Sequence, residues 1–312
     1  MSRARMTDSP AYAAAQPILS VLIPFLRDDP AALLARLDAE ASALGGAVEL
    51  VVLDDGTGDA GLTAALTRQI REARLPVRLI SLTANEGRSR GRNRLASAAR
   101  GRTWLFLDSD MRPDRPDFLK AWVALVQKDD PAVAFGGFSL LQAPTDAQFA
   151  VHRALAQRSE CLPVEVRRLT PEKYVYTSNL LVRRDVFESE AFDPGFTGWG
   201  WEDVEWAMRV SRAHPVQHVD IPATHMGLDT VESLIRKYEQ SAGNFARVIA
   251  RHPDIIATYP SYRAARYIRR LPGRGMLRGL ARTWAQRDGL PVASRAFALR
   301  LYRAALYAEA VK

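Results

Sequence analysis

The stretch "TWLFLDSD", residues 103–110, joins an apolar run to two acids spaced one residue apart, Asp108 and Asp110. The apolar run predicts a buried β-strand. Side chains two residues apart on a strand point to the same face, so the two carboxylates can converge where the strand ends. Oxygen ligands of this kind suit Mg²⁺ or Mn²⁺. The stretch therefore predicts a cation site at a strand end, and a polar turn leaving a buried strand is the alternative interpretation.

Outward from this strand, apolar runs alternate with amphipathic stretches over the first 130 residues. Strands are predicted over residues 18–25, 47–55, 76–82 and 103–108, and helices over residues 30–44, 60–73, 88–100 and 115–127. Because strands and helices take turns, the sequence predicts an α/β fold with a mainly parallel sheet and helices on both faces. Ligands of such sheets bind at the carboxyl ends of the strands.

The pattern is looser in the second half of the chain. Strands are predicted over residues 132–141, 178–184 and 215–222, and helices over residues 201–213 and 229–252. Residues 1–17 are expected to be a flexible lead-in, and residues 253–312 a basic, mostly helical extension.

Composition narrows the class of protein. With 312 residues and 47% hydrophobic content, the chain can bury a substantial core. The net charge is +8, but residues 261–312 alone carry 12 Lys or Arg against 2 acids. The single cysteine, Cys161, excludes an internal disulfide framework and fits a reducing compartment. With no long apolar run and no signal-peptide pattern, we expect a cytoplasmic protein.

A second pair of acids, Asp54 and Asp55, ends the predicted strand over 47–55. The glycines that follow in "VVLDDGTGDAG" (51–61) match G-x-G-x-x-G, a dinucleotide-binding pattern. However, no acid follows the next strand to hold a ribose, and two carboxylates directly before the glycines would repel a pyrophosphate. We interpret the match as a coincidence. Asp-Gly favours turns, but two successive acids exceed what a turn needs, which favours a ligand role for one of them.

Two further segments carry candidate site residues. "NEGRSRGRNR" (85–94) places four arginines at the start of a predicted helix, where a bound phosphate would offset their unfavourable position against the helix dipole. A solvated basic face is the alternative.

"FTGWGWEDVEWAMR" (196–209) suggests an exposed turn that carries Trp199, followed by acids at a helix start, where they are also ordinary dipole partners. Trp206 is predicted to be core, and His225 follows a strand either as a metal ligand or as a surface residue.

Taken in order, the segments resemble the landmarks of the family 2 glycosyltransferases over about residues 18–230: "SVLIPF", "VVLDDGTGD", "NEGRSRGRN", "WLFLDSDM" and "GWEDVEWAMRV". "GFTGWGWEDVEW" is also similar to the Gly-Trp-Gly-x-Glu-Asp motif of β-1,4-galactosyltransferases and of galactosaminyl-transferring bacterial polysaccharide enzymes. The resemblance implies a GT-A fold, with a Rossmann-like sheet, over residues 18–252. Its nucleotide-binding half would be residues 18–130 and its acceptor and catalytic half residues 131–252.

The resemblance also implies roles for individual residues. Contacts to the nucleotide sugar are implied for Pro24, Asp54, Asp55, Asn85, Gly87, Arg92, Asp108 and Trp199, with Asp55 before Asp54 as the contact to the base. A divalent cation, Mn²⁺ or Mg²⁺, would be held by Asp110 and His225, with Asp108 contacting the ribose or the metal. Asp203 would be the base that activates the acceptor, and Glu202 a contact to the acceptor or donor sugar. The absence of a Gln-x-x-Arg-Trp motif argues against a processive synthase.

The expected function is metal-dependent, inverting transfer of a Gal, GalNAc or GlcNAc type sugar from a UDP-sugar to a hydroxyl of a glycan or glycolipid, in surface polysaccharide synthesis. One alternative is a sugar-nucleotide nucleotidyltransferase, although the glycine-rich loop of those enzymes is missing after the first strand. The other is a non-catalytic protein that binds nucleic acid or membranes through residues 261–312. We expect no nucleic-acid partner. Whether that segment contacts the inner face of a membrane or is a solvated face stays open.

Overall fold

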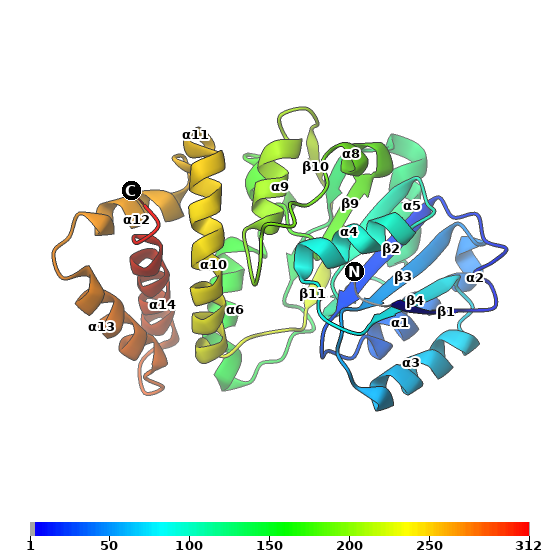
Figure 1. The fold of residues 1–312 in the computed structure, drawn as a ribbon, viewed down its shortest axis with the longest axis horizontal. Helices are drawn as coiled ribbons and strands as arrows, with labels where there is room; N and C mark the ends of the chain where they lie inside the picture. The colour runs from blue at the N-terminus through cyan, green and yellow to red at the C-terminus, as the bar shows by residue number, and fades with distance from the viewer. Residues whose placement is uncertain (1–3, 312) are drawn as a thin grey trace.

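The computed structural model describes residues 4–311, which form one large mixed sheet, a small second sheet and a set of surrounding helices (Figure 1). The strands of the large sheet, in spatial order, are β1 (Ala4–Asp8), β4 (Val77–Leu82), β3 (Val48–Asp54), β2 (Leu19–Phe25), β5 (Thr103–Leu107), β9 (Asn179–Arg183), β7 (Val133–Phe135) and β10 (Val216–His218). The central strands β4, β3, β2 and β5 are all parallel, whereas β9 runs antiparallel to both of its neighbours. The predicted mainly parallel sheet is confirmed.

Helices cover both faces of this sheet, as the alternating pattern predicts. One face is covered by α1 (Ala31–Asp38), α3 (Ala60–Glu72) and α5 (Phe118–Asp129), and the other by α4 (Arg88–Ala98), α8 (Arg184–Ser189) and α9 (Glu202–Val210). On β2, Val21 and Ile23 face the first set of helices, while Leu22 faces the second. Trp206 lies fully buried in the second cluster, so its prediction as a core residue is confirmed.

The expectation of a flexible lead-in over residues 1–17 is wrong for residues 4–8, which form a strand. Residues 1–3 of that segment lie outside the described residues. Residues 4–8 form β1, which pairs antiparallel with β4 and extends the edge of the large sheet. Asp8 forms an ion pair with Arg78 of β4 (2.8 Å). The alternating polar sequence of β1 is typical of an exposed edge strand, and it lacks the apolar run by which the central strands were predicted.

The small sheet brings two distant parts of the chain together. It contains β6 (Met111–Pro113), β11 (Ala223–His225) and β8 (Phe138–Ser139). His225 is the register partner of Met111, and the Met226 N–H donates to the Asp110 carbonyl (2.9 Å). Pairing of β11 with β6 therefore sets His225 beside Asp110, across 115 positions of sequence.

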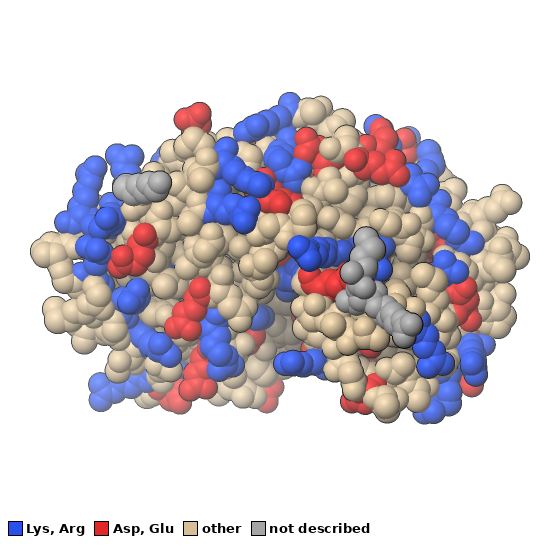
Figure 2. Space-filling view, in the orientation of Figure 1, with Lys and Arg blue, Asp and Glu red and all other residues tan. Residues whose placement is uncertain are grey.

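The C-terminal helices form a second helical layer at the end of the molecule away from the large sheet (Figure 1). They are α10 (Val231–Arg251), α11 (Pro253–Ile256), α12 (Pro260–Arg269), α13 (Arg274–Gln286) and α14 (Val292–Tyr307). Helix α14 shares a core with α10 and with α6 (Ala150–Ser159), through Leu299, Ile235 and Val151. Figure 2 shows many Lys and Arg side chains over this end, with acids among them. Within residues 4–311, no helix is both long and apolar enough to cross a bilayer.

The remaining helices are short: α2 (Ala41–Leu44), α7 (Val164–Arg167) and two 3₁₀ turns, Ala147–Phe149 and Pro171–Lys173. The predicted helix over residues 30–44 is in fact divided between α1 and α2. In the break, the Glu40 carboxylate accepts hydrogen bonds from the N–H groups of Leu119 and Lys120 (3.2 and 3.1 Å), which belong to the first turn of α5. Glu40 thus satisfies helix donors that would otherwise lack partners.

Candidate functional site

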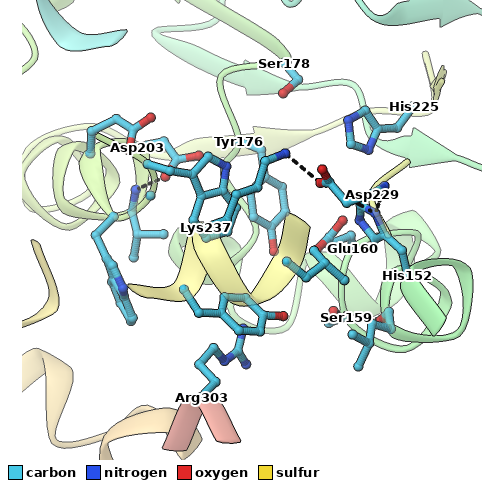
Figure 3. A pocket seen from close by; sticks show the side chains of 18 of the residues that line it. His152, Ser159, Glu160, Tyr176, Ser178, Asp203, His225, Asp229, Lys237 and Arg303 are labelled. Atoms are coloured by element: carbon cyan, nitrogen blue, oxygen red, sulfur yellow. Dashed lines mark hydrogen bonds and ion pairs between the residues drawn. The ribbon is translucent and has the colours of Figure 1, made fainter. Parts of the chain in front are cut away.

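Two adjoining pockets lie at the carboxyl ends of β2, β3 and β5, where the sequence predicts a ligand site. The first, which we call the strand-end pocket, has a volume of about 500 Å³ and is lined by Pro24, Asp28, Asp55, Asn85, Gly87 and Arg92, among others. The second, the tryptophan pocket, has a volume of about 370 Å³ and is lined by Trp199, Glu202, Asp203, His225, Tyr238 and Arg303, among others (Figure 3). Residues that line both pockets are Arg88, Asp108, Asp110, Trp199 and Lys237.

Asp55 organises one wall of the strand-end pocket. Its carboxylate accepts hydrogen bonds from the N–H groups of Glu86 and Gly87 (2.7 and 3.1 Å) and from Nδ2 of Asn85 (3.0 Å). Gly87, the N-cap residue directly before α4, has φ of 88°, a backbone conformation that favours glycine. Burial raises the pKa of Asp55. The structure thus brings Asp55 of one motif to Asn85 and Gly87 of another.

Asp54, by contrast, is turned away from the site. Its Oδ1 accepts a hydrogen bond from the Thr57 N–H (2.8 Å), which fixes the glycine turn after β3. Asp54 is not among the described residues that line either pocket. Its position is that of a turn-forming aspartate.

The four arginines of residues 85–94 do not form one cluster. Arg92, only 2% exposed, donates to Asp108 Oδ1 (2.7 Å), and Arg88 pairs with Glu202 (2.7 Å). Arg94 instead pairs with Glu86 (2.7 Å), and Arg90 is exposed. Since residues on a helix point in different directions, only Arg88 and Arg92 reach the pockets.

Asp108 lies between the two arginines. Burial alone would raise the pKa of Asp108, but the charges of Arg92 and Arg88 outweigh this effect and lower it. Its second oxygen accepts a hydrogen bond from the Ser178 hydroxyl (2.9 Å). Both carboxylate oxygens are therefore engaged by side chains.

Asp110 and His225 form one group that fits a divalent cation. His225 Nε2 lies 3.3 Å from Asp110 Oδ2, and Nδ1 of the same ring is buried with no hydrogen-bond partner among the described residues. Burial alone would lower the pKa of His225, but Asp110 raises it. A carboxylate oxygen beside an imidazole nitrogen is a donor set suited to Mn²⁺ and related ions.

Two residues near His225 were missed by the sequence analysis. His152 of α6 and Glu160, directly after α6, approach His225 so that one potential ligand atom from each of the three lies within 4.8 Å of the others. Burial lowers the pKa of His152 to about 4, and its Nδ1 accepts a hydrogen bond from the Asp229 N–H (2.7 Å). These residues lie more than 60 positions before His225 and form no motif with it, so the sequence carried no signal.

The turn before α9 sends its two tryptophans in different directions. Gly198 and Gly200 have φ of 70° and 86°, and Trp201 itself has φ of 76°, which is unusual for a residue with a side chain. Trp199 lines both pockets, 6.2 Å from the ring of Tyr238. Trp201 also lines the tryptophan pocket, so the turn contributes both rings to that pocket and Trp199 alone to the strand-end pocket.

Trp201 anchors the same turn to the C-terminal helices. Its ring packs on Phe245 of α10 (4.8 Å), and its Nε1 donates to the Tyr307 hydroxyl of α14 (3.0 Å). No link between the C-terminal extension and the site was expected from the sequence. The link depends on contacts between residues 106 positions apart, which leave no local pattern.

Glu202 and Asp203 begin α9 and have different environments. Glu202 is buried; Arg88 binds one of its oxygens, and the other has no hydrogen-bond partner within residues 4–311. Asp203 faces the tryptophan pocket and accepts a hydrogen bond from the Val204 N–H (2.8 Å). Burial and the charge of Glu202 raise the pKa of Asp203 to about 7. A carboxyl group that titrates near neutrality in a pocket is suited to accept a proton from a ligand.

Sequence comparison places most of the chain among known transferases. The model of the family "Glycosyl transferase family 2" matches residues 20–190. A 70-residue stretch, 22% of this chain, is 50% identical to the succinoglycan biosynthesis protein ExoO of Rhizobium meliloti (strain 1021). That stretch spans 19% of the relative, so the chain matches about a fifth of its length.

Two solved structures show the same fold at low sequence identity. A mannosyltransferase from Pyrobaculum calidifontis, in complex with GDP-Man and Mn²⁺, is 17% identical with a TM-score of 0.55, over 75% of this chain and 65% of that one. The glucosyl-3-phosphoglycerate synthase of Mycobacterium tuberculosis, in complex with phosphoglyceric acid, is 19% identical with a TM-score of 0.50, over 77% of this chain and 81% of that one.

Proposed function

The chain belongs to glycosyl transferase family 2 and is a glycosyltransferase with the GT-A fold, and from this premise we propose that it transfers a sugar from a UDP-sugar to a hydroxyl group of a glycan or glycolipid. The observation that carries the proposal is the position of Asp203. A carboxyl group with a pKa of about 7 shares one pocket with Asp110 and His225, and that pocket adjoins a second one at the strand ends. Family membership also sets aside the nucleotidyltransferase and the non-catalytic alternatives.

The strand-end pocket is the proposed donor site. Its volume of about 500 Å³ is within the range of small-molecule sites. Asp55, Asn85 and Pro24 line the part proposed to bind the base, and Arg88 and Arg92 lie where the pocket adjoins Asp108. The mannosyltransferase of similar fold was solved with a nucleotide-diphosphate sugar, which supports this class of donor. Trp199, at the boundary of the pockets, offers a flat face to the donor sugar, which we propose to be of the Gal, GalNAc or GlcNAc type.

Asp110 and His225 are proposed to hold a divalent cation, Mn²⁺ or Mg²⁺. When bound, the cation would neutralise charge on the departing diphosphate. Asp108 is proposed to contact the ribose and not the cation, because Arg92 and Ser178 already donate hydrogen bonds to its two carboxylate oxygens. The Mn²⁺ in the structurally similar mannosyltransferase supports a requirement for a divalent cation.

The proposed reaction is a single displacement. Asp203 takes the proton of the acceptor hydroxyl, the hydroxyl oxygen forms a bond to the anomeric carbon, and the bond from that carbon to UDP breaks on the opposite face. This inverts the anomeric configuration and releases UDP. Arg88 binds one oxygen of Glu202, and the second oxygen, buried without a partner among residues 4–311, is proposed to accept a hydrogen bond from a sugar hydroxyl.

The test is release of UDP from a series of UDP-sugars by the full chain, with and without Mn²⁺. We expect one donor to be hydrolysed or transferred, and Asp203→Asn to lower kcat by about 100- to 10,000-fold, the usual contribution of a general base. Asp129→Asn, which changes an exposed acid at the end of α5, is the matched control and should keep full activity. Full turnover by Asp203→Asn would remove the base assignment.

The likeness to a succinoglycan biosynthesis protein supports a role in polysaccharide synthesis. Contact with a membrane surface is a further part of the proposal. Met276, Leu280 and Trp284 recur every four residues along α13, so they share one face of the helix, and all three are exposed. Arginines flank this apolar stripe, at positions 274, 278 and 282. An exposed apolar stripe beside arginines favours binding to anionic lipid over a solvated face.

A further inference from the structure

Arg303 projects from α14 into the tryptophan pocket, although the basic C-terminal segment is otherwise mainly a surface feature. Figure 3 shows its side chain directed from α14 toward the pocket interior, on the side opposite Ser178 and His225. The side chain is partly buried, whereas Arg300, one turn earlier on the same helix, is exposed. Arg303 is not among the described residues that line the strand-end pocket.

Of the Lys and Arg residues that line the tryptophan pocket, Arg303 and Lys173 have no carboxylate partner within the described residues. Arg88 pairs with Glu202 (2.7 Å), and Lys237 pairs with Asp229 (2.6 Å). Arg303 forms no ion pair or hydrogen bond with any residue in the described part of the chain. Its contact is with the ring of Tyr238, 5.1 Å from the guanidinium carbon. Glu160 lines the same pocket but is not within ion-pair distance of Arg303.

An unpaired guanidinium that is withdrawn from water is costly, and it cannot lose its charge at ordinary pH. Folded proteins therefore pair such groups as a rule. Arg303 faces a cavity that a ligand can enter, so a ligand can supply the missing negative charge. Lys173, the other basic residue of the pocket without a carboxylate partner among residues 4–311, lies over the ring of Tyr259 (5.5 Å).

Two phenols add hydrogen-bond donors to the same pocket. The hydroxyls of Tyr176 and Tyr238 have no hydrogen-bond partner within the described residues, and both side chains line the pocket. Burial raises the pKa of both phenols, so they stay protonated and can donate. A planar guanidinium with phenolic O–H donors is suited to bind the oxygens of a carboxylate or a phosphate.

We propose that Arg303 binds an anionic group on the acceptor, a carboxylate or a phosphate, and thereby selects acidic acceptors. The inference rests on the proposed function, because it takes the tryptophan pocket to be the acceptor site. The acceptor hydroxyl then reaches Asp203 while the anionic group lies at α14. Because Arg303 lies outside the strand-end pocket, the anionic group belongs to the acceptor and not to the donor sugar.

The experiment measures binding of three probes to the full chain by isothermal titration calorimetry, in the presence of UDP and Mn²⁺: glucuronate, glucose 6-phosphate and glucose. We expect at least one anionic probe to bind more tightly than glucose. Arg303→Gln should weaken binding of that probe by about 10- to 100-fold, the usual effect of removing a charged hydrogen-bond partner. Arg303→Lys, which keeps the charge without the planar fork, should weaken it less. Whichever anionic probe is affected more identifies the source of the charge as carboxylate or phosphate.

The matched control is Arg300→Gln, which removes an exposed arginine from the same helix and should bind all probes as the wild type does. Lys173→Gln tests the other unpaired cation of the pocket. The inference is overturned if Arg303→Gln leaves anion binding unchanged, if it weakens glucose equally, or if the loss follows Lys173 instead. It is also overturned if replacing Arg303 affects only the use of UDP-glucuronate as a donor.

Failure of the inference and failure of the proposed function give different results. Release of UDP from nucleotide sugars by the wild type is measured in parallel. Hydrolysis of a donor without dependence of acceptor binding on Arg303 removes the inference alone. Binding of an anionic probe that depends on Arg303, with no nucleotide sugar bound or hydrolysed, removes the proposed function and leaves an anion site at α14.

Discussion

Asp110 can lie beside His225 only because residue 227 is glycine. A Cβ atom at Gly227 would meet Asp110 Oδ2 at 2.0 Å and Cγ at 2.9 Å, closer than real atoms approach. Gly227→Ala should therefore displace the carboxylate and weaken Mn²⁺ binding by about 10- to 100-fold, as for other changes that reorient a metal ligand. Calorimetric titration with Mn²⁺ measures the effect.

The control for this change is Gly243→Ala in α10, where a Cβ atom would meet nothing within 4 Å. Alanine there should leave Mn²⁺ affinity unaltered and should slightly favour the helix. Equal Mn²⁺ affinity in the Gly227 variant and the wild type would show that Asp110 is not a ligand.

The pKa of Asp203, about 7, predicts a pH dependence of kcat/KM. A general base must be deprotonated, so kcat/KM should fall as pH falls through about 7 and reach a plateau above it. The charge of Glu202 contributes to the raised pKa. Glu202→Gln should therefore shift the acid limb to lower pH, whatever it does to the maximal rate. A profile of kcat/KM against pH for both proteins tests this, and an unmoved limb would contradict the coupling.

At the scale of residues, motifs identified part of the candidate site. Asp110, Asp203 and Trp199 were singled out from the sequence, and the structure brings them to adjoining pockets. The residue pattern alone left open which of Asp54 and Asp55 has a ligand role, and the family resemblance pointed to Asp55 first. Which carboxylate faces a pocket depends on the turn that follows β3. Residues such as His152 and Arg303 were missed, since they approach the site from helices that share no motif with it.

Among the structural elements, α14 holds the tryptophan turn in place. The Tyr307 hydroxyl accepts a hydrogen bond from Trp201 Nε1 (3.0 Å) and bonds with the Ser241 hydroxyl (2.7 Å). Tyr307→Phe leaves Trp201 Nε1 without its partner, which should lower the free energy of unfolding by about 1–3 kcal/mol. Urea denaturation measures this loss.

Tyr267→Phe is the matched control, because Tyr267 on α12 is 68% exposed and its hydroxyl can bond to water. Its effect should stay within about 0.5 kcal/mol, as for most surface changes. If both variants unfold at the same urea concentration, the Tyr307 hydroxyl does not stabilise the contact between α14 and the turn before α9.

The central elements were predicted more accurately than the peripheral ones. Strands β2 and β5 lie within one residue of their predicted bounds, because strands buried on both faces are continuous apolar runs. Short strands such as β6 and β11 were missed, since three residues carry no periodicity and depend on their pairing partners. The break between α1 and α2 was also missed, because it involves a contact between Glu40 and α5, far along the chain.

For the molecule as a whole, the apolar stripe on α13 predicts binding to anionic vesicles. Leu280→Gln with Met276→Gln should reduce co-sedimentation with phosphatidylglycerol vesicles by about 10-fold or more, given about 25 cal/mol per Å² of apolar surface buried. Loss of binding in high salt would show the contribution of the flanking arginines. Vesicle binding equal to that of the wild type would remove the membrane contact. Truncation at Ser261 is unsuitable as a test, because it also deletes Arg303 and Tyr307 from the tryptophan pocket.

The segment that matches the family ends at residue 190, but most of the tryptophan pocket is built after it. Trp199, Asp203 and His225 lie beyond the match, and Arg303 lies more than 100 positions beyond it. If the tryptophan pocket binds the acceptor, as we propose, mutation or recombination in the last third of the chain can alter the acceptor while the matched segment stays unchanged. On this proposal, two chains equally similar over residues 20–190 can have different acceptors, and the residues that distinguish those acceptors lie on helices that the shared segment does not contain.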